Sequence, residues 1–136
     1  MMPFAIGIVL ALAVSAYATT LQLDRDRAFY PTVVFVVAAY YVLFAVMGGS
    51  GRAIVVESAI MGVFVVAASL GFRRNLWLVA AALAAHGVMD FFHAHLVANP
   101  GVPAWWPAFC GSYDVVAAAY LAWRLTRNSA PPVQVA

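Results

Sequence analysis

Five long apolar stretches constrain the fold of this chain of 136 residues more than any other feature. A transmembrane helix needs about 20 mainly apolar residues, and each stretch is close to that length. Hydrophobic residues make up 66% of the sequence and charged residues 9%, whereas soluble domains are far less apolar and more charged. We therefore predict an all-α integral membrane bundle of five transmembrane helices, at residues 3–21, 30–47, 52–72, 76–97 and 105–125. Residues 1–127 are expected to form one transmembrane domain, and residues 128–136 a disordered cytoplasmic tail.

The basic residues predict the orientation of the bundle. All seven are arginines, and six of them lie near the ends of the first, third and fifth stretches. Only Arg52 lies on the opposite side. Because basic loops stay in the cytoplasm, the N-terminus is predicted outside and the C-terminus in the cytoplasm. So few arginines in each loop also argue against nucleic-acid binding.

A cleaved signal peptide is the alternative for the first stretch, because Ala16-Tyr17-Ala18 resembles a cleavage site. The first five residues contain no lysine or arginine, which the start of a signal peptide needs. We therefore expect a retained transmembrane helix.

Ionisable residues gather in the fourth stretch. His86, Asp90 and His93 follow one another at i, i+4 and i+7, so a helix places all three on one face. His95 falls on the opposite face and is expected near the membrane interface. Such groups are costly in lipid, and in membrane proteins they usually mark a functional site.

Neighbouring stretches add acids at a similar depth, Glu57 in the third and Asp114 in the fifth. If these two acids and Asp90 were all charged and without partners, the three together would cost on the order of 8 to 10 kcal/mol in the membrane. No arginine is predicted at their depth, whereas carboxylates and imidazoles on facing helices are known to hold metal ions. We predict a divalent transition metal (Zn, Fe or Mn) held by His86, Asp90, His93 and Asp114. Glu57 is then a fifth ligand, or the catalytic general base acting on metal-bound water.

Other interpretations use the same side chains. They could form only a hydrogen-bonded packing network with protonated acids, or a path for protons or ions in a transport or channel protein. A transporter this small would have to form a homo-oligomer. A scaffold or accessory subunit of a membrane complex is a further alternative. Cys110, four residues before Asp114, is expected to be a small buried hydrophobic residue more often than a ligand.

The order of these residues along the chain is similar to the pattern of a known protein family. Glu57 is followed by His86-Gly-Val-Met-Asp90-Phe-Phe-His93, then by Asn99-Pro100, and then by Cys110 and Asp114. This order resembles a family of small bacterial integral membrane proteins of unknown function, over about the C-terminal two thirds of the chain. It departs from the family pattern at Ala94, where the family has a second histidine. The resemblance implies a shared site in a multi-pass protein of the bacterial inner (plasma) membrane, and it names no reaction.

Together these features favour a metal-dependent hydrolase that acts on a membrane lipid or on another lipid-like small-molecule substrate. Hydrolysis is favoured over redox chemistry because nothing in the sequence supplies an electron path. The proline-rich segment at residues 99–107 contains Trp105 and Trp106, which suit a membrane interface and are expected to gate access to the site.

Overall fold

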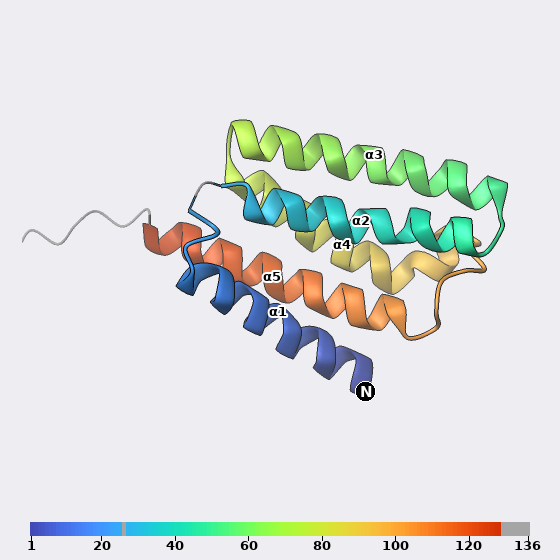
Figure 1. Ribbon diagram of the computed structural model, residues 1–136, viewed down its shortest axis with the longest axis horizontal. Helices are drawn as coiled ribbons and strands as arrows, with labels where there is room; N and C mark the ends of the chain where they lie inside the picture. Colours follow the sequence, from blue (N-terminus) through green and yellow to red (C-terminus); the bar gives the residue numbers. More distant parts are fainter. Residues whose placement is uncertain (26, 129–136) are drawn as a thin grey trace, which may run out of the picture.

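The computed structural model describes residues 1–25 and 27–128, and every regular element in these ranges is an α-helix. Consecutive helices run in opposite directions (Figure 1). They are α1 (Met2–Thr20), α2 (Phe29–Met47), α3 (Gly51–Arg73), α4 (Leu76–Leu96) and α5 (Trp106–Asn128). The predicted stretches match these helices to within three residues at each end. Residues 129–136 of the predicted tail lie outside the described residues.

Local side-chain bonds explain where two of the helices begin. The Ser50 hydroxyl accepts a hydrogen bond from the Ala53 backbone N–H at 3.2 Å, which caps α3. The Asn75 side-chain oxygen accepts one from the Trp77 N–H at 2.9 Å, which caps α4. Between α2 and α3 the chain turns tightly at Gly49, whose φ of 66° suits a residue without a side chain.

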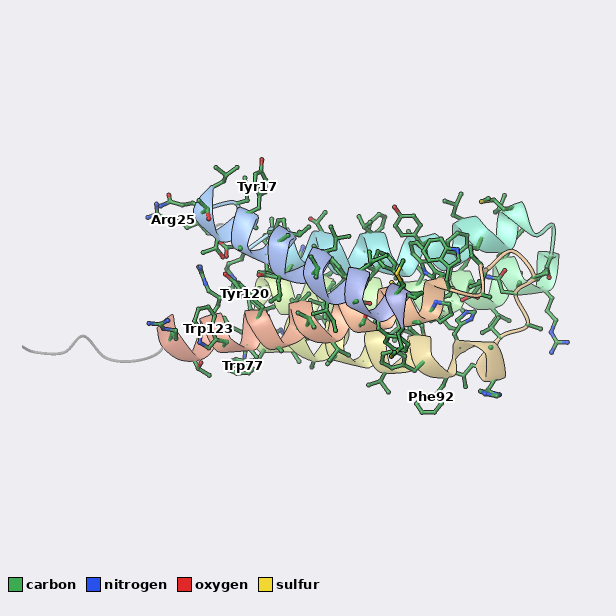
Figure 2. The ribbon with its side chains drawn as sticks, turned by 90° about the horizontal axis from the view of Figure 1, so that it is seen from below. Tyr17, Arg25, Trp77, Phe92, Tyr120 and Trp123 are labelled. Atoms are coloured by element: carbon green, nitrogen blue, oxygen red, sulfur yellow. The ribbon has the colours of Figure 1, made fainter. Side chains whose placement is uncertain are left out.

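The two ends of the bundle differ in charge. The α1–α2 loop, the α3–α4 turn and the end of α5 lie together, and they carry six of the seven arginines; we call this the arginine end. The opposite end holds the α2–α3 turn and the α4–α5 connection, and we call it the loop end. Figure 2 shows Arg25 near the arginine end with the aromatic side chains of Trp77, Tyr120 and Trp123. Arginine and aromatic side chains in one band are typical of a membrane interface.

Four helices, α1 to α4, are long and apolar enough to cross a membrane. The fifth is of similar length, with 23 residues, but it is less apolar because it includes Asp114 and two arginines. Figure 1 shows α1 and α3 on opposite flanks of the bundle, with the other three helices between them.

Small residues allow α1 to pack closely on α5. The buried face of α1 consists of Gly7, Ala11, Ser15 and Ala18, which recur at helical spacing. A Cβ atom at Gly7 would collide with the Ser112 side chain, so this contact requires glycine. The rest of α1 is largely exposed, so its packing inside the bundle rests mainly on this one stripe.

Candidate metal centre

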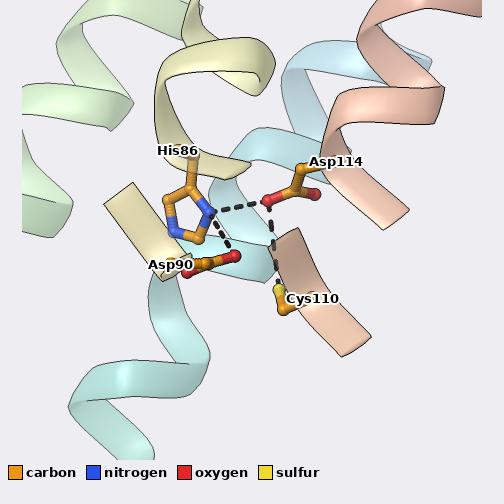
Figure 3. Close-up of side chains that lie close together, drawn as sticks. All are labelled: His86, Asp90, Cys110 and Asp114. Atoms are coloured by element: carbon orange, nitrogen blue, oxygen red, sulfur yellow. Dashed lines mark hydrogen bonds and ion pairs between the residues drawn. The ribbon is translucent and has the colours of Figure 1, made fainter. Parts of the chain in front are cut away.

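Four ionisable side chains from α4 and α5 meet in the half of the bundle nearer the loop end (Figure 3). They are His86 and Asp90 on α4, and Cys110 and Asp114 on α5. Each offers one ligand atom, and these atoms all lie within 4.8 Å of one another. We call this group the four-residue cluster. It is closed to the surroundings, because none of the four residues is more than 2% exposed.

His86 is at the middle of the cluster. Its Nδ1 atom forms a hydrogen bond with Asp114 Oδ2 at 2.7 Å, and it lies 3.5 Å from Asp90 Oδ2. The Cys110 thiol donates a longer hydrogen bond of 3.9 Å to the same Asp114 oxygen. A single nitrogen, two carboxylate oxygens and a sulfur therefore face one another across the α4–α5 interface.

The backbone geometry of this interface explains how the four side chains meet. On each helix the two members are four residues apart, so they share a face. The helices approach closely because Gly87 and Gly111 face each other next to the cluster. A Cβ at Gly87 would lie only 2.8 Å from the Gly111 carbonyl oxygen, and one at Gly111 only 2.9 Å from that of Gly87.

Several polar atoms in the cluster are buried without a hydrogen-bond partner in the described part of the chain. They are His86 Nε2, both carboxylate oxygens of Asp90, and Asp114 Oδ1. Buried polar groups nearly always have a hydrogen-bond partner, so several without one at a single place make this group, which could hold a metal ion, the candidate site. Among the described residues, no arginine forms an ion pair with either aspartate.

Aromatic rings surround the imidazole of His86. The Phe64 ring meets it edge to face at a centroid distance of 4.9 Å, and the Tyr41 ring lies 6.0 Å away. Toward the arginine end the core continues mainly with apolar residues, including Val34, Val79 and Leu83, which are fully buried, and the buried Tyr30 hydroxyl belongs to the same group of residues. The core next to the cluster on this side is therefore largely apolar.

A second buried polar network lies beside the cluster, between α3, α4 and the α4–α5 connection. His93 Nε2 and Glu57 Oε1 are 2.8 Å apart, and both side chains are almost fully buried. The Asn99 side-chain amide donates to the same Glu57 oxygen at 2.9 Å and to the Tyr41 carbonyl oxygen at 3.0 Å. The Tyr41 ring stacks on the His93 ring at 4.0 Å, so it separates this network from His86.

The structure thus distributes the predicted site residues over two adjoining groups. Three predicted ligands, His86, Asp90 and Asp114, come together in the cluster. The fourth, His93, pairs with Glu57 in the second network. His95 is exposed, as its angle on the helix predicts.

Three further residues contribute to the site, although they are not among the predicted ligands. Cys110 was expected to be a plain core residue, but its thiol contacts Asp114. Its i, i+4 spacing from that aspartate was the available signal. Tyr41 contributes through its ring stack on His93. Asn99 contributes through hydrogen bonds to Glu57 and Tyr41, which lie 42 and 58 residues away in the sequence, and no local sequence pattern reveals such contacts.

Comparisons with models of protein families, with curated proteins and with solved structures found no match to this chain.

Proposed function

We propose that the chain is an integral membrane protein that binds a divalent transition metal ion at the four-residue cluster. His86, Asp90 and Asp114 are the obligatory ligands. Zn²⁺ suits this set best, because it accepts imidazole and carboxylate ligands in a compact tetrahedral site, where three protein ligands leave one position open. Fe²⁺ is the second candidate.

The observation that carries this proposal is the carboxylate of Asp90, whose nearest charged partner is His86 Nδ1 at 3.5 Å, an atom already bonded to Asp114 at 2.7 Å. Both carboxylate oxygens of Asp90 are buried and lack a hydrogen-bond partner among the described residues, at a residue that is 0% exposed. A buried carboxylate is tolerated when it is paired or coordinates a metal. A divalent cation beside His86 Nδ1 would satisfy Asp90 and Asp114 together and neutralise their charge.

The alternative of a proton or ion path across the membrane receives less support. Such a path needs polar groups along the whole span. The largely apolar core that includes Val34, Val79 and Leu83 lies directly beyond the cluster toward the arginine end. This arrangement favours a site reached from one side only.

We further propose that α5 spans the membrane with the other four helices. It packs between α4 and α1, which are themselves apolar enough to span. Trp106 and Trp123 are 17 positions apart on it, a rise of about 26 Å, close to the thickness of the hydrocarbon core. Placing the arginine end in the cytoplasm then puts the cluster in the outer half of a bacterial inner membrane, with the N-terminus outside.

The reaction we propose is hydrolysis of an ester bond in a lipid or in another membrane-soluble substrate. The oxygen of water forms a bond to the acyl carbon, the bond from that carbon to the alkoxy oxygen breaks, and the proton from water goes to the alkoxy group. A metal at the cluster supplies activation of water and polarisation of the ester carbonyl. Glu57, the predicted general base, pairs with His93 and Asn99 in the second network, so the proposal assigns it no direct part in the reaction.

Metal binding is tested with the full chain purified in detergent, stripped with chelator and titrated with Zn²⁺. We expect close to one equivalent to bind, and Asp90→Asn to weaken binding by more than about 100-fold, since a ligand is lost. Thr126→Val, at an exposed site near the end of α5, is the control and should bind normally. Binding below about a tenth of an equivalent, or equal binding by the Asp90→Asn variant, would refute the metal site.

The Cys110→Ala variant tests the hydrolase part separately. A catalytic zinc keeps one coordination position open, whereas four protein ligands close the site. We expect the variant to keep one equivalent of Zn²⁺, with an affinity within about tenfold of the parent. Loss of binding would make Cys110 an essential fourth ligand, which would contradict hydrolysis and leave the metal site standing.

A further inference from the structure

A large apolar groove runs along the bundle between α1 and α2, with α5 as its floor. Its volume is about 1020 Å³. The side chains that line it are almost all hydrocarbon or aromatic, and they include Ile6, Leu10, Val36, Val37, Phe109 and Cys110. Its walls belong to two helices that are apolar enough to cross a membrane, so the medium that reaches it is the bilayer interior.

The groove has the length of a lipid chain. Along α2 its lining extends from Ala28, the residue before the helix, to Tyr40, which corresponds to a rise of about 18 Å. One leaflet contributes about half of a hydrocarbon core that is about 30 Å thick. The groove is therefore long enough for an extended lipid chain, and its α2 lining runs from the arginine end to just past the middle of α2.

The groove also reaches the candidate metal centre. Cys110 is only 2% exposed, yet it lines the groove, and its thiol contacts Asp114 within the four-residue cluster. On an ordinary lipid-facing surface, lipid contacts only the outward-facing side chains of the helices. This groove is deeper, because its lining includes Cys110, a residue of the four-residue cluster.

A polar anchor lies near the loop end of the groove. Trp106 lines it, and the indole N–H of this residue is buried without a hydrogen-bond partner among the described residues. Trp106 is one helical turn from Cys110, about 6 Å along the axis of α5. A group that accepts a hydrogen bond from the indole would therefore lie close to the level of the cluster.

We propose that this groove binds one acyl chain of a bilayer glycerolipid. The chain extends along α2 toward Ala28. The Trp106 indole N–H is buried in this structure, so it donates a hydrogen bond to the ester carbonyl oxygen once the ring turns toward the groove. The ester linkage then lies beside Cys110, next to the metal centre. This inference rests on the proposed function, in which the four-residue cluster is a metal-dependent hydrolase site. It adds the class of substrate, a glycerolipid, and the route by which the substrate reaches the site.

The experiment uses the full chain in lipid nanodiscs with a phosphatidylethanolamine that carries a diazirine in the middle of one acyl chain. After illumination, mass spectrometry maps the labelled residues at increasing mole fractions of the probe. We expect labelling that saturates and that concentrates on groove residues such as Val36 and Val37. Labelling that rises in proportion to the probe and falls equally on the exposed face of α3 would overturn the proposal.

Two variants and a control sharpen the test. Val36→Trp fills the groove and should reduce saturable labelling by about tenfold or more. Val63→Trp makes the same change on the lipid-facing side of α3, where Val63 is 69% exposed and lies outside the groove, and it should leave labelling unchanged. Trp106→Phe removes only the indole donor and should raise the half-saturating mole fraction by about two- to tenfold. An unchanged half-saturation point in that variant would overturn the assignment of the ester to Trp106.

Zinc titration of the same samples separates the two proposals. If the lipid proposal is wrong and the metal proposal is right, labelling does not saturate while one equivalent of Zn²⁺ still binds. If the metal proposal is wrong and the lipid proposal is right, Zn²⁺ does not bind while labelling still saturates.

Discussion

Replacing His93 with alanine separates a metal ligand from a partner of Glu57. The imidazole lies 2.8 Å from the Glu57 carboxylate, and both side chains are almost fully buried. Removing one member of a buried hydrogen-bonded pair leaves its partner unsatisfied, which costs about 1 to 3 kcal/mol. We therefore expect His93→Ala to lower the free energy of unfolding by about 1 to 3 kcal/mol, although Asn99 keeps one hydrogen bond to the carboxyl group.

A double-mutant cycle gives the coupling between the two residues. Glu57→Gln removes the carboxyl group but keeps an acceptor and a donor in place, so we expect it to cost about 1 to 2 kcal/mol. When both changes are combined, the carboxyl group that His93→Ala alone would leave without its partner is also gone. The double variant should therefore be more stable than the sum of the single effects predicts, by about 1 to 2 kcal/mol.

The assay is reversible unfolding of the purified chain in mixed detergent and SDS micelles, with Zn²⁺ titration of the same variants. His95→Ala is the matched control, since His95 is on the same helix but exposed, and its effect should stay within about 0.5 kcal/mol. His93→Ala should keep its zinc affinity within about threefold, because His93 is outside the cluster. Additive stability effects would refute the buried pair, and a loss of zinc affinity by about 100-fold would make His93 the ligand that the sequence predicts.

Three further predictions follow from contacts elsewhere in the bundle. Gly87→Ala should lower the free energy of unfolding by about 1 to 3 kcal/mol in the same SDS titration, because the new Cβ meets the Gly111 carbonyl oxygen. Gly62→Ala is the control: a Cβ there meets no atom of another helix within 4 Å among the described residues, so this variant should be neutral or stabilising. Zn²⁺ at about 100 times its Kd should stabilise the folded chain by about 2.7 kcal/mol, and the gain should vanish with chelator and in the Asp90→Asn variant. Ser112→Ala removes the hydrogen bond to a backbone carbonyl of α1 and should cost about 0.5 to 1.5 kcal/mol, and an unchanged stability would argue against that contact.

The helices were predictable because their signal is local. Each apolar stretch needs only its own residues to indicate a spanning helix, and the caps at Ser50 and Asn75 agree with the ends that the sequence suggests. The proposed membrane span of α5 has a weaker sequence signal, since its Trp, Tyr and charged residues lower its hydropathy. Its position between α4 and α1 in the bundle gives the stronger argument for a spanning helix.

The site was predictable in part, and the limit was geometric. Helical angles correctly group His86 with Asp90 on one face, and depth alone brings Asp114 to a similar level. Depth and angle cannot decide which of two facing helices a side chain will meet. His93, one turn from Asp90 on the same face, therefore pairs with α3 while Asp90 meets α5.

The place of α1 in the bundle connects the two proposals. This helix supplies no residue to the four-residue cluster or to the Glu57 network, and it packs chiefly on α5 through its stripe of small residues. α1 lies to one side and leaves a groove that ends at Cys110, which is itself only 2% exposed. On our proposal, a lipid in this groove approaches the closed site from the bilayer. A metal centre that served stability alone would gain nothing from this route, whereas an enzyme that acts on lipids requires it.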